Sequence, residues 1–205
     1  MKTKLIMHSP FKLIIQMSGA PGSGKSSIAN LLAQSELINA VVINHDLIKS
    51  FFLELDMSLD QAAKLAYRLD WTLAEDMIKQ GRSVIIDSVC NYNELINDGI
   101  ALARKYGYDY KYIECKVGDI DLLDRRLQTR TSLRSQRTGV NRPPAGASGT
   151  SHSAEDSHAL FKKWENPCRP DDDVIVVDST VGLEECLAHV LKQIASTTPT
   201  IVSTL

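Results

Sequence analysis

The sequence has few cysteines and no long apolar run. Its four cysteines lie far apart and form no C-x-x-C pair, which excludes a dense disulfide framework and a cysteine-rich zinc site. The N-terminal segment MKTKLIMHSPFKLIIQM interrupts its short apolar runs with lysine and proline, so we expect neither a signal peptide nor a membrane span. A cytoplasmic protein with reduced thiols is the simplest prediction.

An excess of charge of one sign is also missing. The chain has 23 basic and 25 acidic residues, so no general positive field draws it to nucleic acid or to an anionic membrane. Its 205 residues, of which 43% are hydrophobic, can form one substantial hydrophobic core but are too few for two well-packed domain cores. We therefore expect a single domain over residues 1–205. The sequence does not indicate its oligomeric state.

Strand-like apolar runs alternate with longer helical patterns. Strands are expected at residues 12–17, 40–44, 83–87, 110–117 and 173–177. Helices are expected at residues 25–34, 58–80, 91–106, 119–138, 154–164 and 181–195. The pattern at residue 58 opens with the capping box S-L-D-Q, and Gly107 is expected to close the helix before it. This alternation predicts an α/β fold with helices around a parallel sheet.

The pattern changes after residue 119. Arg126, Arg130, Arg134 and Arg137 recur at spacings of four, four and three, so a helix that persists to residue 138 would carry them on one basic face. The next stretch, GVNRPPAGASGTSHS, is too rich in Gly, Pro and Ser to order itself by burying apolar surface. We expect residues 126–155 to form a mobile lid and residues 196–205 to form a polar tail.

A phosphate-binding loop lies between the first strand and the first helix. The segment GAPGSGKS at residues 19–26 matches G-x-x-x-x-G-K-[ST], and its N–H groups are expected to surround a phosphate. Lys25 would bind the β- and γ-phosphates, and the Ser26 hydroxyl would join the shell of a bridging Mg²⁺. The loop residues expected to bind ATP are Gly19, Ala20, Pro21, Gly22, Ser23, Gly24, Lys25, Ser26 and Ser27.

Two acidic residues lie at the ends of the next two predicted strands. Asp46 follows the strand over residues 40–44, and Asp87 ends the strand over residues 83–87. The carboxyl ends of parallel strands face the ligand crevice, so both carboxylates are expected to flank the γ-phosphate. Which of them lies closer to the metal stays open. Two simpler roles are that Asp46 caps the following helix and that Asp87 closes a turn.

These motifs resemble a branch of the P-loop kinases. The chain lacks the N-K-x-D motif of GTPases and the D-E pair of AAA-type and helicase ATPases. Over residues 12–180 it is similar to the zeta-toxin and polynucleotide-kinase-like (AAA_33-type) branch, which includes gluconate and chloramphenicol kinases. The resemblance implies a three-layer P-loop NTPase fold with strand order 2-3-1-4-5. It also implies ATP and Mg²⁺ as cofactors and transfer of the γ-phosphate of ATP to a hydroxyl group.

The resemblance also assigns roles to single residues. Asp46 stands where the branch has its general base, and Arg126 and Arg130 stand where its lid closes over ATP. The expected catalytic residues are Asp46, Lys25 and Arg130. The expected nucleotide ligands from the lid are Arg126 and Arg130, and the expected Mg²⁺ ligands are Ser26 and Asp87. The acceptor is expected to contact Asp46, Arg68, Asp87 and Asn91.

The identity of the acceptor is open at this point. A small molecule is favoured over a polynucleotide 5′-hydroxyl, because the basic residues are scattered and the net charge is −2. A nucleotide-sugar kinase of the zeta-toxin type is an alternative. A switch that binds ATP without transferring phosphate to a small molecule is an alternative of another class. Such a switch has no need of the Asp46 carboxylate.

Overall fold

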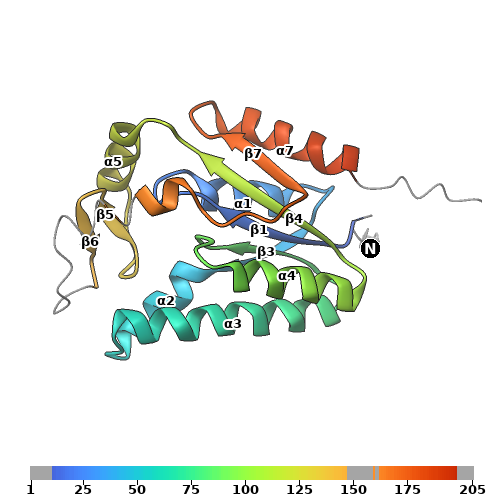
Figure 1. Ribbon diagram of the computed structural model, residues 1–205, viewed down its shortest axis with the longest axis horizontal. Helices are drawn as coiled ribbons and strands as arrows, with labels where there is room; N and C mark the ends of the chain where they lie inside the picture. Colours follow the sequence, from blue (N-terminus) through green and yellow to red (C-terminus); the bar gives the residue numbers. More distant parts are fainter. Residues whose placement is uncertain (1–10, 147–158, 160–161, 198–205) are drawn as a thin grey trace, which may run out of the picture.

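The computed structural model describes residues 11–146, 159 and 162–197 of the chain. A five-stranded parallel sheet lies at its centre (Figure 1). In spatial order the strands are β2 (Ala40–Asn44), β3 (Ser83–Asp87), β1 (Leu13–Ser18), β4 (Asp109–Lys116) and β7 (Val174–Asp178). Because β7 is the fifth strand expected from the sequence, the predicted order 2-3-1-4-5 is confirmed.

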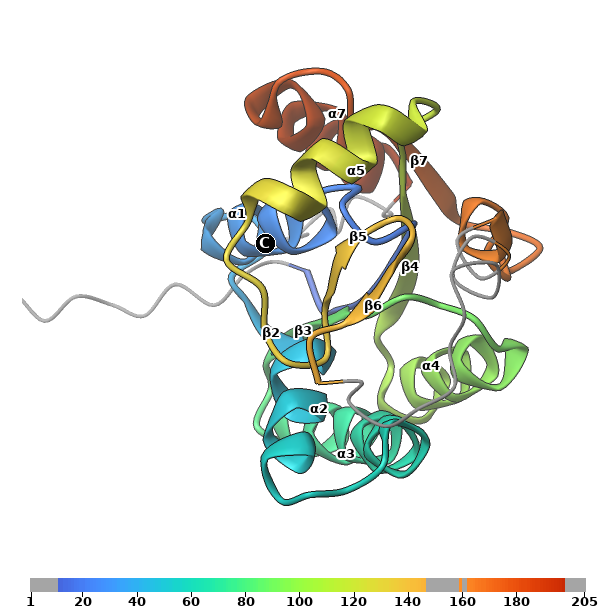
Figure 2. The same cartoon turned by 90° about the vertical axis from the view of Figure 1, so that its left-hand side faces the viewer.

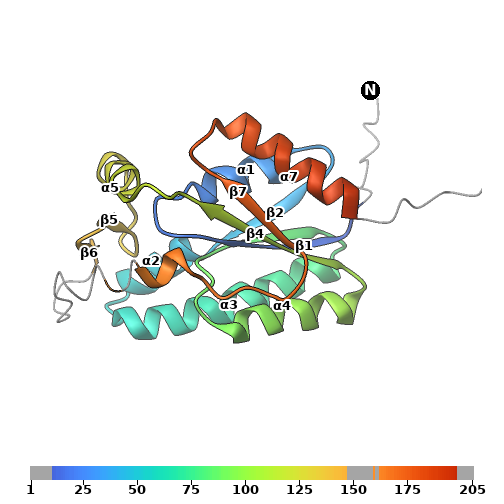
Figure 3. The same cartoon turned by 45° about the horizontal axis from the view of Figure 1, so that its top comes forward.

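Helices cover both faces of the sheet and make three layers (Figures 1 and 3). One face carries α1 (Lys25–Gln34) and α7 (Leu183–Thr197), and the other carries α2 (His45–Glu54), α3 (Leu59–Lys79) and α4 (Asn93–Tyr106). Successive side chains of β1 point to opposite faces, so Ile15 packs in the core with α1 and α7, and Ile14 packs in the core with α3 and α4. The sheet is therefore apolar on both faces, as parallel sheets are. None of the helices in these ranges is long and apolar enough to cross a bilayer.

Capping signals in the sequence set the ends of two helices. The Ser58 hydroxyl accepts a hydrogen bond from the Gln61 N–H at 3.3 Å, and the Gln61 side chain accepts one from the Ser58 N–H at 3.4 Å. This confirms the predicted capping box at the start of α3. Gly107 closes α4 in the left-handed conformation, with a φ of 68°, as predicted.

The sequence pattern did not predict α2. This helix begins directly after β2, and the Asn44 side chain caps it by accepting a hydrogen bond from the Leu47 N–H at 3.1 Å. Asp46 lies in the first turn of the helix, so the alternative role of Asp46 as the N-cap is wrong. The cap provided by Asn44 leaves the Asp46 carboxylate available for other partners.

The predicted arginine-rich helix ends early. α5 (Ile120–Thr129) stops at Thr129, and Arg130 already has an extended backbone with φ −79° and ψ 151°. The prediction of a helix over residues 119–138 is therefore wrong beyond residue 129. Of the four arginines expected on one helical face, Arg126 is the one that α5 contains.

Tertiary contacts explain why the chain leaves the helix at this point. Two short antiparallel strands, β5 (Arg137–Gly139) and β6 (Arg142–Pro144), lie beside α5 at one end of the sheet (Figure 2). The Asp124 carboxylate accepts a hydrogen bond from the Val140 N–H at 2.7 Å, and Val140 packs against Leu123 and Leu127 of α5. Such long-range contacts override local helix propensity. The predicted lid tip at residues 139–153 is described up to residue 146, and this part contains the end of β5 and all of β6, so the expectation that it cannot order itself is wrong there. Residues 147–153, most of the predicted helix over residues 154–164 and most of the polar tail lie outside the described residues.

Gly99 lies where α4 packs against Trp71 of α3 and Tyr110 of β4. A Cβ atom on Gly99 would lie 2.5 Å from Cε2 of Tyr110 and 2.9 Å from Cη2 of Trp71. Alanine forms helices better by about 1 kcal/mol, but we expect overpacking to outweigh this gain and Gly99→Ala to destabilise the protein by about 1–3 kcal/mol. Urea unfolding followed by circular dichroism measures the change. A Gly99→Ala protein at least as stable as the wild type would contradict the packing argument.

Candidate active site

The phosphate-binding loop is a tight turn between β1 and α1. Gly19, Gly22 and Gly24 have φ values of 125°, 86° and 87°, which residues with a Cβ atom rarely adopt. A Cβ atom on Gly19 would also lie 2.2 Å from the carbonyl oxygen of Cys115. Gly24 directly precedes α1, so the turn brings the unpaired N–H groups of a helix N-terminus to the carboxyl end of the sheet. This geometry suits a bound phosphate.

Lys25 is the first residue of α1, and its ammonium group lies over the loop. Nζ donates hydrogen bonds to the carbonyl oxygens of Gly19 and Ala20 at 2.8 and 3.0 Å. The side chain is buried, and burial lowers the pKa of Lys25, while the nearby Asp87 carboxylate acts in the opposite direction. A buried cation whose hydrogen-bond partners are neutral carbonyls is stabilised by an incoming anion. The residues of the loop therefore fit the phosphates of ATP.

Ser26 and Asp87 lie together at the edge of the loop. Asp87 ends β3 and is buried, and the Ser26 hydroxyl lies close enough to act on its carboxylate. Burial raises the pKa of Asp87, and the Ser26 hydroxyl opposes this shift. In the part of the chain that the structure describes, no group of three His, Cys, Asp or Glu residues could hold a metal ion. The Ser26 and Asp87 oxygens fit Mg²⁺, which takes few protein ligands and keeps waters and phosphate oxygens.

Asp87→Asn is expected to stabilise the nucleotide-free protein at neutral pH, although it removes a candidate Mg²⁺ ligand. Because burial disfavours the charged carboxylate, the neutral amide should raise Tm. In the folded wild-type protein the pKa of Asp87 lies above the ordinary value of 3.8. The charged carboxylate therefore lowers the free energy of unfolding fully at pH values above the folded pKa and not at all below pH 3.8. Thermal melts should therefore show a Tm difference that shrinks as the pH falls. A difference that is constant with pH would contradict this origin.

Residues that follow α5 hold the Asp46 carboxylate. Its Oδ1 accepts a hydrogen bond from the Ser135 hydroxyl and its Oδ2 accepts one from the Gln136 side-chain amide, both at 3.0 Å. Ser135 is fixed on α2, because its N–H donates a hydrogen bond to the Ser50 hydroxyl at 3.0 Å. These bonds orient the carboxylate of Asp46 and join residues 130–136 to α2. No sequence motif marks Ser135 or Gln136, so sequence reasoning missed both.

His45 forms a buried pair with Asp70 of α3. Its Nδ1 lies 2.7 Å from Oδ2 of Asp70, and Tyr67 stacks on the imidazole with the ring centroids 4.1 Å apart. Burial raises the pKa of Asp70, and the hydrogen bond with His45 opposes this shift. Both contacts fix the His45 ring at the wall of the cavity next to Asp46. Asp70 lies 25 residues from His45 in the sequence, so only the fold reveals the pair.

The groups described above surround a cavity of about 570 Å³, within the range of about 300–1,000 Å³ that ligand sites occupy. The predicted site residues that line it are Pro21, Gly22, Gly24, Lys25, Ser26, Ser27, Asp46, Asp87, Asn91, Arg126 and Arg130. Gly19, Ala20 and Ser23 form the buried base of the loop. Arg68 lies apart from them, exposed on α3, so the structure does not place it in the cavity wall.

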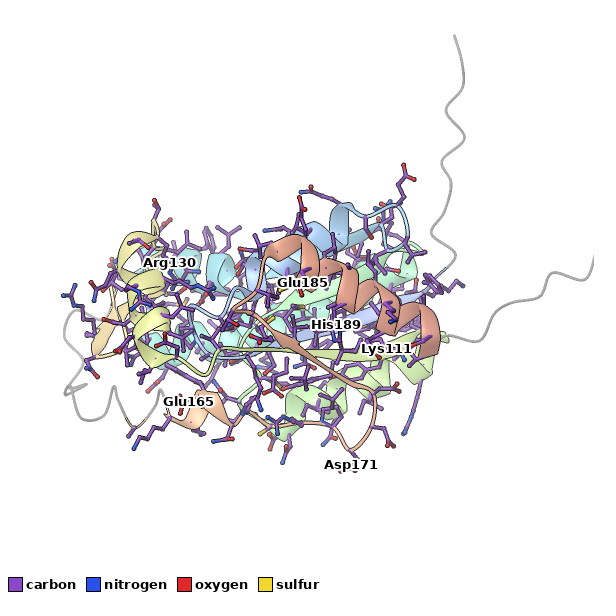
Figure 4. The ribbon with its side chains drawn as sticks, turned by 90° about the horizontal axis from the view of Figure 1, so that it is seen from above. Lys111, Arg130, Glu165, Asp171, Glu185 and His189 are labelled. Carbon is purple, nitrogen blue, oxygen red and sulfur yellow. The ribbon has the colours of Figure 1, made fainter. Side chains whose placement is uncertain are left out.

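Arg126 and Arg130 approach the phosphate-binding loop from the end of α5. Arg126 donates hydrogen bonds to the carbonyl oxygens of Gly22 at 3.4 Å and Ser179 at 2.9 Å. Arg130 lies beside α5 in Figure 4, and its guanidinium donates to the carbonyl oxygen of Arg137 at 3.1 Å. Burial lowers the pKa of Arg130, and the Asp46 carboxylate acts in the opposite direction. The two arginines meet at the cavity because α5 ends there, and not because they share a helical face.

Comparisons with known proteins agree with this geometry. Residues 14–142 match the family model AAA_33, described as an AAA domain. A candidate kinase from Chloroflexus aurantiacus J-10-fl aligns with a TM-score of 0.66 at 18% identity, covering 93% of this chain and 99% of that chain. For a gluconokinase from Sinorhizobium meliloti 1021 the TM-score is 0.57 at 16% identity, with 91% and 93% covered.

The APS kinase of Mycobacterium tuberculosis, solved with AMPPNP and APS, has a TM-score of 0.58 at 18% identity, with 91% of this chain and 99% of that chain covered. At such identities the three solved structures establish a shared fold, which is the P-loop NTPase fold predicted from the sequence. The match to the family model spans the phosphate-binding loop, both acidic strand ends and the segment after α5. The chain therefore belongs to the AAA_33 family of AAA domains.

Proposed function

We propose that the protein is an ATP-dependent kinase that transfers the γ-phosphoryl group of ATP to a hydroxyl group of a small-molecule acceptor. The position of Asp46 carries the proposal, because its carboxylate lines the same cavity as the phosphate-binding loop and Lys25. Binding of a nucleotide needs the loop and the lysine. A carboxylate beside them is needed where a hydroxyl group must lose its proton.

Each wall of the cavity has its own role in this reaction. The backbone N–H groups of residues 22–27 bind the phosphates, and Lys25 and Arg130 stabilise the negative charge on the transferring phosphoryl group. Ser26 and Asp87 hold the Mg²⁺ ion, which neutralises phosphate charge when bound. Asp46 accepts the proton of the acceptor hydroxyl, so that this oxygen can form its bond to phosphorus as the bond to ADP breaks.

Unpaired polar atoms in the cavity wall support a hydroxyl-bearing acceptor. The Asn91 side-chain carbonyl oxygen and the Ser88 hydroxyl are buried and have no hydrogen-bond partner among the described residues, and both side chains line the cavity. A ligand with several hydroxyl groups would supply the missing partners. Two proteins that share the fold also support this kind of acceptor. One is named a gluconokinase, and the other is an APS kinase that was solved with AMPPNP and APS.

Phosphate transfer from ATP tests the proposal. The protein is incubated with ATP, Mg²⁺ and a panel of sugars, sugar acids, nucleosides, nucleotide sugars, aminoalcohols and 5′-hydroxyl oligonucleotides, and the products are identified by mass spectrometry. A phosphorylated small molecule with an equal amount of ADP is the expected result. Transfer to the oligonucleotides alone would identify a polynucleotide kinase. Tight ATP binding without transfer to any acceptor would contradict the proposal and favour an ATP-binding switch.

A further inference from the structure

The cavity wall carries more positive charge than a nucleotide requires. Its charged residues are the cations Lys25, Lys49, Arg126, Arg130 and Arg137 and the anions Asp46 and Asp87. Among the described residues, five cations and two carboxylates leave an excess of three positive charges when His45 is neutral. ATP with one bound Mg²⁺ carries a net charge of about −2 at neutral pH. The described part of the cavity wall therefore carries about one more positive charge than this nucleotide balances.

Three of the five cations belong to the nucleotide side of the cavity. Lys25 and Arg126 donate hydrogen bonds to carbonyl groups of the phosphate-binding loop. Arg130 is one of the charges that act on Lys25. The other two cations that line the cavity come from other elements, Lys49 from α2 and Arg137 from β5.

Lys49 and Arg137 lie near each other and line the same cavity as Asp46. Lys49 is one turn after Asp46 on α2, and the charges that act on it are Asp46, Asp60 and Arg137. Arg137 follows Gln136, whose amide binds the Asp46 carboxylate. The two cations and the candidate base therefore surround the region that an acceptor must occupy.

The Lys49 ammonium group is a half-buried cation without a bound counterion. It makes no hydrogen bond and no ion pair with another residue of the described ranges, and the nearby Asp60 is exposed at the start of α3. Burial lowers the pKa of Lys49, which means that its surroundings disfavour the charge. An anion bound beside it would relieve this cost.

Arg137 is built into the cavity wall. It is 5% exposed, and its guanidinium donates hydrogen bonds to the carbonyl oxygens of Val140 and Arg142 at 3.2 and 3.0 Å. The same group lies 5.0 Å from the ring centroid of Trp164. A guanidinium held in this way keeps its position when a ligand arrives, so it attracts an anion without reorganisation.

We infer that the acceptor carries an anionic group, such as a carboxylate, a phosphate ester or a sulfate ester, which Lys49 and Arg137 bind. The inference rests on the proposed function and adds the chemical class of the acceptor. The anionic group lies against Lys49 and Arg137 in the same cavity as Asp46. The hydroxyl group that is phosphorylated then lies between this anion and the γ-phosphate, within reach of the Asp46 carboxylate.

Matched pairs of acceptors that differ in one anionic group test the inference. Suitable pairs are gluconate and glucitol, glycerate and glycerol, and a nucleoside 5′-phosphate and its nucleoside. Binding is measured by calorimetry on the protein loaded with a non-hydrolysable ATP analogue and Mg²⁺, and transfer is measured with ATP. For at least one pair, the anionic member should bind at least about 10-fold more tightly. Lys49→Met should weaken binding of that member about 10- to 100-fold and leave ATP affinity unchanged.

Lys64→Met is the matched control, because Lys64 is an exposed lysine of α3 that does not line the cavity. It should leave binding of the anionic member unchanged, and Lys49→Arg should restore part of the affinity lost in Lys49→Met. The inference is overturned if no anionic member binds more tightly than its neutral partner, or if Lys49→Met binds both members as the wild type does. Efficient transfer to neutral acceptors alone would overturn this inference and leave the proposed kinase activity intact. Preferential binding of an anion without any transfer would support the anion site and contradict the kinase activity.

Discussion

Lys25→Met is expected to lower kcat for phosphoryl transfer by about 100- to 1,000-fold. The ammonium group is buried over the phosphate-binding loop, where it can reach the phosphate oxygens on which negative charge increases during transfer. Methionine has a similar length and no charge, so it removes this stabilisation with little change in volume. The affinity for ATP should also fall, because the proposed role places the same charge against the phosphates of the bound nucleotide before the reaction.

Steady-state kinetics and calorimetric titration with ATP separate the two effects of Lys25→Met. Because Nζ also ties the loop to the carbonyl groups of Gly19 and Ala20, thermal melts must show that the variant is folded. Lys64→Met controls for the loss of a lysine elsewhere on the surface. A kcat within about threefold of the wild-type value would show that Lys25 does not stabilise the transition state.

Asp46→Asn is expected to lower kcat by about 100- to 10,000-fold and to leave the affinity for ATP nearly unchanged. The amide has the shape of the carboxylate but cannot take the proton of an acceptor hydroxyl. In the wild type both carboxylate oxygens of Asp46 accept hydrogen bonds, one from Ser135 and one from Gln136. The asparagine amide has one oxygen and one NH₂ group, so its NH₂ group would face one of these donors and could not accept from it. The variant therefore loses both proton transfer and part of its fixed orientation.

Asp172→Asn is the matched control for this substitution, because Asp172 is exposed in the turn before β7. Kinetics with a saturating acceptor measure kcat, and calorimetry measures ATP binding for both variants. Turnover by Asp46→Asn at the wild-type rate would remove Asp46 from the role of general base. If Asp46→Asn lowers both the affinity for ATP and the turnover, Asp46 contributes to the nucleotide site.

Features that depend on neighbouring residues could be predicted from the sequence. The glycines of the loop, the capping box at Ser58 and the Gly107 helix end are local patterns, and all three are present in the structure. The order of the sheet follows from the resemblance to P-loop kinases. Lys25, Asp46 and Asp87 line one cavity. This could be predicted because parallel strands bring their carboxyl ends to the same edge of the sheet.

Features that depend on distant residues could not be predicted. The hydrogen bonds of Asp46 come from residues about 90 positions away, and the Asp70 partner of His45 lies on another helix. The arginine spacing after residue 119 satisfies a helical pattern, yet the contact between Asp124 and Val140 directs the chain into β5. Arg68 fits the composition of an acceptor site, but it lies on the exposed side of α3.

The bonds from Ser135 and Gln136 to Asp46 have a consequence for protein engineering. Lids of related folds are attractive parts to exchange when a new specificity is sought. In this protein the segment after α5 is also a support of the candidate base, so it is not an independent module. A chimaera that receives a foreign segment over residues 131–146 without an equivalent of Ser135 and Gln136 should fold and bind ATP, yet leave Asp46 in several orientations. Grafts should therefore begin beyond residue 137 or carry this pair with them.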